Sequence, residues 1–257
     1  MKKYPKVLVA APTHESKNYC IYEWMENVAK FSYGNFEVYI SDNSPTPENA
    51  KWINETFGIK VGWKNTEGKG VYEKITDGHN DCRKYAMDGN FDYLFHLETD
   101  VFPPSDAIER LIFHRKKVVN GWYMIGGGGG RHPVYRLNQN NTLLQREFSW
   151  SYVLQNNIHH LGHSGLIKVM QSGLGCQMIH KSVFNKQEFR NPIIKGSIQK
   201  ERDGLEMGGS ADSYWCNDLY YELKVDNLVD LSLFCIHKND SYSWGRNAEL
   251  IMNDKSE

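Results

Sequence analysis

Hydrophobic and polar positions in the first hundred residues follow two alternating periods. Four short runs are almost continuously apolar, which is typical of strands buried on both faces of a sheet: 6–11, 36–40, 59–63 and 93–97. The segments between them repeat apolar residues at helical spacing, as Ile21, Met25 and Val28 do within 18–31. This order predicts an α/β fold with a mostly parallel sheet flanked by helices, whose ligands bind at the carboxyl ends of the strands.

Two further helices are predicted before residue 90. One covers 48–57, and the other follows the glycine-rich loop at 68–70. The second helix carries apolar residues that fit a single face, namely Val71, Ile75, Cys82, Tyr85 and Ala86. We expect this face to pack against the sheet.

Beyond residue 100 the pattern is less regular. Helices are expected after Pro103 and from Ser210, and short strands at 122–125, 177–179 and 231–236. The glycine run 126–130 predicts no regular element, because each glycine adds conformational entropy to the unfolded chain without packing a side chain. The polar and aromatic stretch 131–170 predicts an irregular insertion on the acceptor side of a site.

Length and charge limit the possible classes of protein. With 257 residues, of which 40% are hydrophobic, the chain can bury one large core, and we expect a single domain over 1–257. The 30 basic residues almost balance the 31 acidic ones, so the protein has no large net positive charge that would attract nucleic acid or an anionic membrane. The apolar run Val7–Ala11 stops at Pro12 and is too short to span a bilayer. No stable membrane insertion is therefore expected.

Cysteine usage favours a reducing compartment. The five cysteines are odd in number and scattered, with no C-x-x-C pair: Cys20, Cys82, Cys176, Cys216 and Cys235. We expect buried thiols and a cytoplasmic protein.

Two carboxylates directly follow the predicted strand at 93–97. Glu98 and Asp100 are two positions apart and would point to the same side if the strand continued through them. Hard oxygen ligands favour magnesium, manganese or calcium over zinc. The alternative is a solvated turn in which Asp100 caps the helix near Ser105. The strand context favours a metal site.

The order of motifs along the chain resembles that of GT-A glycosyltransferases, most closely the broad family 2-like group. The resemblance rests on 7–13, 38–44, 78–100 and 172–176, and on the single residues Asp212 and His237. It implies the GT-A (Rossmann-like) fold, with a nucleotide-binding half over 1–104 and an acceptor-binding half over 105–257. Glu98 departs from the family pattern, which usually has aspartate at this position of the D-x-D motif.

The resemblance also implies an activity. The protein would be a metal-dependent, inverting glycosyltransferase of hexosyltransferase type, which moves a sugar from a nucleoside-diphosphate sugar, most simply a UDP-sugar, to a hydroxyl acceptor with Mn²⁺ or Mg²⁺. Asp212 would be the catalytic base, and Asp100, His237 and Glu98 would hold the metal. The donor would contact Pro12, Thr13, Glu15, Asp42, Lys69, Asn80, Glu98 and Thr99.

Several of these residues have structural alternatives. Asp42 could close an Asx turn, and Asp212 could cap its helix. His237 could be a hydrogen-bonded histidine at a strand end, and Lys69 a solvated surface lysine. The triplet His159, His160 and His163 lacks carboxylate or thiolate partners at familiar zinc spacing.

Two other functions stay open at the level of sequence. A sugar-phosphate nucleotidyltransferase can use a similar sheet, although no G-x-G-x-R loop follows the first strand. A non-catalytic nucleotide- or carbohydrate-binding protein could retain the fold without turnover. The acceptor is equally open, including a modified nucleic acid base, as are the sugar, the linkage and the oligomeric state.

Overall fold

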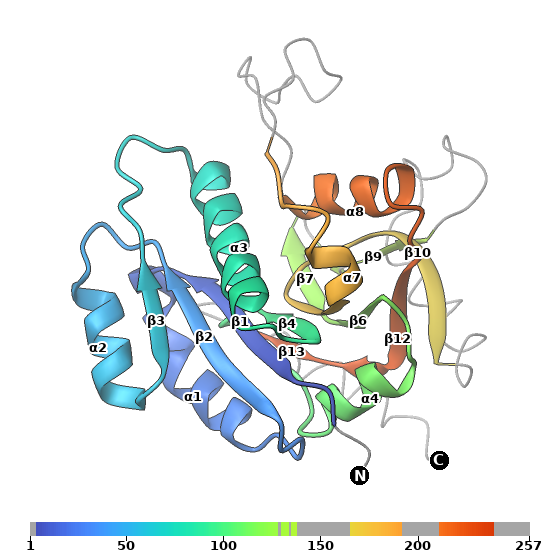
Figure 1. Cartoon of the computed structure of the whole chain (residues 1–257), viewed down its shortest axis with the longest axis horizontal. Coiled ribbons are helices and arrows are strands. Elements are labelled where there is room, and N and C mark those ends of the chain that lie inside the picture. The colour runs from blue at the N-terminus through green and yellow to red at the C-terminus, as the bar shows by residue number, and fades with distance from the viewer. Residues whose placement is uncertain (1–3, 128–129, 134, 138–164, 192–210, 239–257) are drawn as a thin grey trace.

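The computed structural model describes residues 4–127, 130–133, 135–137, 165–191 and 211–238 (Figure 1). Its centre is a nine-stranded sheet. The strands are, in spatial order, β3 (Lys60–Trp63), β2 (Phe36–Asp42), β1 (Val7–Thr13), β4 (Tyr93–Leu97), β11 (Cys176–His180), β6 (Val118–Trp122), β12 (Asn227–Phe234), β10 (Leu166–Ser172) and β9 (Tyr135–Leu137).

The sheet is mostly parallel, as predicted. Strands β3, β2, β1, β4, β6, β12 and β9 run in one direction, whereas β11 and β10 run in the other. The antiparallel strand β11 pairs with β4 on one side and with β6 on the other. It therefore joins strands from the first and second halves of the chain into one sheet.

Helices cover both faces of the sheet (Figure 1). One face packs against α1 (Asn18–Ala29), α2 (Glu48–Phe57) and α4 (Ala107–Phe113). The other packs against α3 (Val71–Asp88), α7 (Lys181–Phe184) and α8 (Ala211–Tyr221). Strand β1 supplies side chains to both layers: Val7 and Val9 lie in one core and Leu8 and Ala10 in the other. Burial on both faces explains why its sequence is apolar throughout.

The glycine run forms regular structure, so the prediction for 126–130 was wrong at its ends. Strands β7 (Met124–Gly127) and β8 (Gly130–Pro133) pair antiparallel, with Gly127 opposite Gly130. A ladder of this kind uses only backbone groups, so glycine can join it despite its entropic cost.

The prediction of an irregular insertion over 131–170 is also wrong at both ends of this range. Strands β8, β9 and β10 occupy parts of 131–170, whereas 138–164, including His159, His160 and His163, lies outside the described residues.

Helix α3 has the predicted length but not the predicted core face throughout. Cys82 and Ala86 are fully buried, whereas Val71 and Ile75 are 71% and 37% exposed, because the first turns of the helix border a pocket. Farther along, Gly78 faces β1, and a Cβ atom on it would lie 2.6 Å from the Cβ of Pro12. Helix α3 can approach the end of β1 this closely only because residue 78 has no side chain.

A second, two-stranded sheet connects the middle of the chain to the last described residues. Strand β5 (Val101–Phe102) pairs antiparallel with β13 (Ile236–His237), which sets His237 opposite Val101. The five cysteines are free and buried, as expected. No helix in the described part of the chain combines the length and the apolar character needed to cross a membrane.

Candidate functional site

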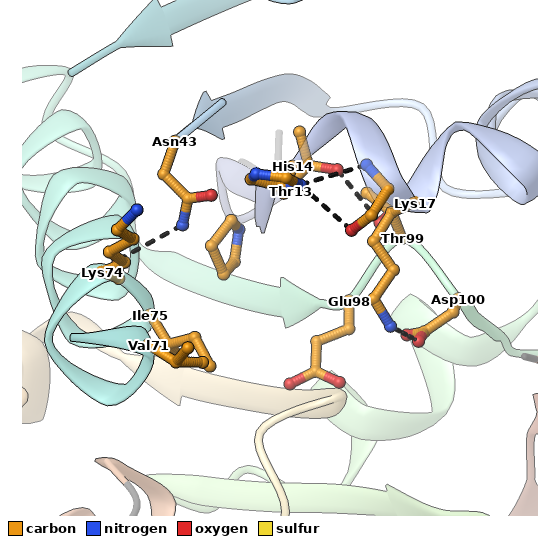
Figure 2. Close-up of a pocket in the computed structure, with 12 residues that line it drawn as sticks. Thr13, His14, Lys17, Asn43, Val71, Lys74, Ile75, Glu98, Thr99 and Asp100 are labelled. Atoms are coloured by element: carbon orange, nitrogen blue, oxygen red, sulfur yellow. Dashed lines mark hydrogen bonds and ion pairs between the residues drawn. The ribbon is translucent and has the colours of Figure 1, made fainter. Parts of the chain in front are cut away.

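A pocket of about 430 Å³ opens at the carboxyl ends of the parallel strands. Its walls come from the end of β1, the residues after β2 and β4, and the first turns of α3 (Figure 2). The volume falls within the range of small-molecule sites, and the position is where open α/β sheets bind ligands. The sequence prediction of a site at this edge of the sheet therefore coincides with a cavity.

Glu98 and Asp100 lie in a turn rather than on a strand. Strand β4 ends at Leu97, and the Val101 N–H donates to the Glu98 carbonyl at 3.0 Å to close the turn. The strand-based reason for expecting the two carboxylates to share one side was therefore wrong. Figure 2 shows Glu98 pointing in a different direction from Asp100, although both line the pocket.

Asp100 is the most strongly engaged carboxylate of the site. Its side chain is 3% exposed, and its Oδ2 receives the ammonium of Lys17 and lies 3.5 Å from Nε2 of His237. Burial acts to raise the pKa of Asp100, but the bond from His237 and the charge of Lys17 outweigh burial and hold it below its usual value. Asp100 is therefore ionised at neutral pH.

Glu98 has a different environment. Burial, followed by the charge of Asp100, raises the pKa of Glu98 to about 7. Asp212 adds to this increase, so its carboxylate lies within electrostatic range of Glu98. The same three carboxylates, after burial, raise the pKa of the buried Tyr123, whose hydroxyl accepts the Gly175 N–H at 3.1 Å. The charges of Glu98, Asp100 and Asp212 thus all act on one buried tyrosine.

His237 completes this cluster. Its ring lies 5.2 Å from that of Tyr123, between centroids, and its Nε2 faces Asp100. Its Nδ1 is buried and has no hydrogen-bond partner within the described residues. Nε2 is therefore the ring nitrogen that contacts the carboxylate of Asp100.

Asp212 is the second residue of α8, and its Oδ1 accepts the Ser213 N–H at 3.0 Å. Helix α8 is fixed to the sheet through a buried polar network. Trp215 Nε1 donates to Gln177 Oε1 at 2.7 Å, and Gln177 Nε2 donates to Asn120 Oδ1, also at 2.7 Å. This network determines where the start of α8 and its carboxylate lie.

Four of the predicted donor residues border the pocket. They are Pro12, Thr13, Glu98 and Thr99, and the hydroxyls of Thr13 and Thr99 lie 3.4 Å apart. Asp42 is fully buried and does not line the pocket: its Oδ1 accepts from Ser44 Oγ at 2.6 Å in an Asx turn, and its Oδ2 has no hydrogen-bond partner in the described chain. The next residue, Asn43, lines the pocket instead.

Three other predicted donor residues do not line it. Glu15 is exposed, and Lys69 is ion-paired with Asp77 on the surface. Asn80 exchanges two hydrogen bonds with the Phe189 backbone, at 2.7 and 2.9 Å, and so fixes α3 to the segment after α7. The structure thus gives Asn80 a packing contact.

Lys17, Asn43, Lys74 and Tyr123 belong to the site but were not predicted. Asn43 follows the predicted aspartate, so the turn after β2 was a usable signal. Tyr123 lay within a predicted strand, where nothing distinguishes a site tyrosine from a core one. Lys17 and Lys74 are single lysines on helical turns without any motif.

The residues present fit a cation that is shared with a ligand. No three His, Cys, Asp or Glu side chains among the described residues form a group that could hold a metal ion alone. Asp100 lines the pocket, and its Oδ2 nevertheless lies 3.5 Å from His237 Nε2; both atoms are suitable donors for Mn²⁺. Mg²⁺ and similar ions are often held by one or two protein ligands together with substrate phosphates.

Comparison with known proteins identifies structures with a similar fold. No protein-family model and no curated protein sequence matches the chain. The structure is similar to S. aureus TarS 1–349 in complex with UDP, with a TM-score of 0.51 and 16% identity over 89% of this chain and 60% of that one. It is also similar to the mannosyltransferase PcManGT from Pyrobaculum calidifontis in complex with GDP-Man and Mn²⁺, with a TM-score of 0.53 and 14% identity over 91% and 57%.

The chain has the GT-A fold. It spans about a third, 34%, of the length of another TarS chain to which it is similar. In this fold, Glu98 and Asp100 of the turn after β4 line the pocket, and His237 contacts Asp100.

Proposed function

We propose that this protein is a metal-dependent, inverting glycosyltransferase that transfers a hexosyl group from a nucleoside-diphosphate sugar, most simply a UDP-sugar, to a hydroxyl acceptor. The observation that carries the proposal is that Glu98 and Asp100 line a pocket at the carboxyl edge of the sheet, with Nε2 of His237 3.5 Å from Asp100 and the charge of Asp212 raising the pKa of Glu98. Two proteins of the same fold have structures with UDP and with GDP-Man and Mn²⁺.

Asp100 and His237, with Glu98 beside them, would hold Mn²⁺ or Mg²⁺. When bound, the cation would stabilise the negative charge that develops on the departing nucleoside diphosphate. Pro12, Thr13 and Thr99 would contact the nucleoside, since they form the pocket wall at the end of β1 and after β4.

Asp212 would act on the acceptor. Its carboxylate would take the proton of the acceptor hydroxyl while that oxygen forms a bond to the anomeric carbon and the bond from this carbon to the diphosphate oxygen breaks. Attack from the face opposite the leaving group inverts the anomeric centre. In this proposal, the donor would bind to residues 1–104 and the acceptor mainly to residues 105–257. The five buried free thiols support a cytoplasmic location.

The test combines binding and turnover. Thermal unfolding is measured with a panel of nucleoside diphosphates and nucleotide sugars in the presence of Mn²⁺, because a ligand of the native state raises the melting temperature by mass action. Donors that stabilise the protein are then assayed for hydrolysis and transfer with Mn²⁺ and with EDTA. Turnover that survives both EDTA and Asp100→Ala would refute the metal assignment, and binding without any turnover would favour a non-catalytic protein.

A further inference from the structure

Two side chains approach a single carboxylate oxygen of Asp100. Asp100 Oδ2 receives the Lys17 ammonium and faces Nε2 of His237 at 3.5 Å. Lys17 belongs to the short helical turn η1 (Glu15–Lys17) directly after β1, and it lines the same pocket as Asp100 (Figure 2). The oxygen that faces the imidazole, and that a metal would use, is therefore already neutralised by a cation of the protein.

Lys17 differs from Asp100 in its freedom to move. The Lys17 side chain is 42% exposed, whereas that of Asp100 is 3% exposed. The Lys17 backbone is fixed by its N–H, which donates to the His14 carbonyl at 2.8 Å. A lysine side chain has a flexible four-carbon stem, so the ammonium can leave Asp100 while the backbone stays in place.

The buried charge explains why a cation is needed when no metal is bound. An ionised carboxylate that is almost completely buried is costly unless it is paired. Lys17 supplies that pairing, and the mutual attraction is visible in the raised pKa of Lys17, where the charge and bond of Asp100 outweigh the lowering by burial. A divalent cation on the same oxygen would repel the ammonium and remove its partner.

We propose that Lys17 is an exchangeable counter-ion: its ammonium occupies Asp100 Oδ2 in the free protein, and a divalent cation displaces it into the pocket, where it binds the diphosphate of the donor. This inference rests on the proposed function, since it takes the metal to bind at Asp100. It adds a phosphate-binding residue that the motif order does not indicate. The same lysine thus balances one of two anions, depending on whether the metal is present.

The first experiment measures Mn²⁺ binding directly, by electron paramagnetic resonance of free Mn²⁺, without donor or acceptor. Lys17→Met keeps the length and apolar stem of the side chain but removes the competing charge. We expect this variant to bind Mn²⁺ about three- to tenfold more tightly than the wild type, as removal of a competing ion pair implies. Its melting temperature without metal should fall, and Mn²⁺ should restore it.

The matched control is Lys181→Met. Lys181 is also ion-paired, with Asp92 at 2.8 Å, and its side chain is 43% exposed, but it lies outside the pocket. This variant should bind Mn²⁺ as the wild type does. Equal or weaker Mn²⁺ binding by Lys17→Met, relative to the wild type, would overturn the exchange.

The second experiment measures UDP binding at saturating Mn²⁺ by calorimetry. Lys17→Met should bind UDP about tenfold more weakly, because a charge-assisted contact with phosphate is lost. Tighter Mn²⁺ binding with unchanged UDP affinity would overturn the phosphate contact. If neither the wild type nor Lys17→Met binds Mn²⁺, with or without UDP, the metal site of the proposed function fails and the exchange fails with it. Wild-type binding without a change in Lys17→Met contradicts the exchange alone.

Discussion

The carboxylate of Asp100 and the imidazole of His237 face each other at 3.5 Å because two very short strands pair next to them. Strand β5 begins one residue after Asp100, and β13 ends at His237. The Lys238 N–H then donates to the Asp100 carbonyl at 2.9 Å, which fixes the backbone on the far side of the histidine. The geometry of the candidate metal site therefore depends on backbone pairing as well as on the two side chains.

His237→Ala should weaken Mn²⁺ binding about 10- to 100-fold, since it removes one of the proposed ligands. Calorimetry with Mn²⁺ and UDP together measures the change. His114→Ala is the control, because His114 also faces a buried aspartate, Asp230 at 2.9 Å, but lies away from the pocket. Equal Mn²⁺ affinity in the wild type and His237→Ala would exclude His237 as a ligand.

Asp212→Asn should lower kcat by about 10²- to 10⁴-fold, the usual contribution of a general base, and leave the affinity for the nucleotide nearly unchanged. Steady-state transfer assays and nucleotide titrations separate the two effects. Asp226→Asn, at an exposed carboxylate paired with Lys168, should retain wild-type turnover. A loss of nucleotide binding in Asp212→Asn would instead indicate that the carboxylate mainly supports the start of α8.

Gln177→Leu should reduce the free energy of unfolding by about 2–4 kcal/mol, because Trp215 Nε1 and Asn120 Oδ1 would lose buried hydrogen bonds. Urea unfolding measures this difference. Gln187→Leu is the matched control: its amide also donates, to Asp218 at 2.9 Å, but the residue is partly exposed, so water can replace the bond. A similar decrease in the free energy of unfolding in the two variants would show that the buried network around Gln177 stabilises the fold no more than a partly exposed hydrogen bond does.

Acid should destabilise the fold through a buried histidine pair. His79 Nδ1 and His96 Nε2 lie 2.6 Å apart, and burial lowers the pKa of His79 well below its usual value and that of His96 to about 4. Both rings stay neutral in the native state, while the unfolded chain takes up protons as the pH falls through about 6.5, so the free energy of unfolding decreases from there towards pH 4.

The expected slope in this range is at most about 1.4 kcal/mol per pH unit for each histidine. Urea unfolding at a series of pH values measures the slope, and the double variant His79→Phe with His96→Leu should flatten it. An unchanged slope in the double variant would assign the acid sensitivity to other groups.

The pattern of apolar and polar residues predicted individual strands and helices such as β4 and α8. Strand β4 covers the predicted 93–97, because its apolar run is bounded by charged Asp92 and Glu98. Helix α8 begins next to the predicted Ser210 for a similar reason: apolar residues at helical spacing follow it. Hydrophobic periodicity suffices for such elements, since it records which side chains face the core.

The same patterns could not predict contacts between residues that are far apart in the sequence. The pairing of Lys17 with Asp100 joins distant parts of the chain through a side chain that has no motif of its own. Strands β7 and β8 pair through backbone hydrogen bonds. Because glycine has no side chain, the sequence shows no pattern of apolar and polar residues from which this pairing could be predicted. Likewise, the displacement of Asp42 from the pocket follows from its bonds to Ser44 and Asn49, which compete with any ligand for its Oδ1.

Gly78 has a consequence for the width of the pocket. Its missing side chain lets α3 approach Pro12 at the end of β1, and residues of both elements line the pocket. In the proposed function, the width available to a nucleobase would therefore depend on this contact between α3 and β1, as well as on the residues that would touch the base. We expect a larger residue at position 78 to act as a spacer between the walls and to relax discrimination between pyrimidine and purine donors.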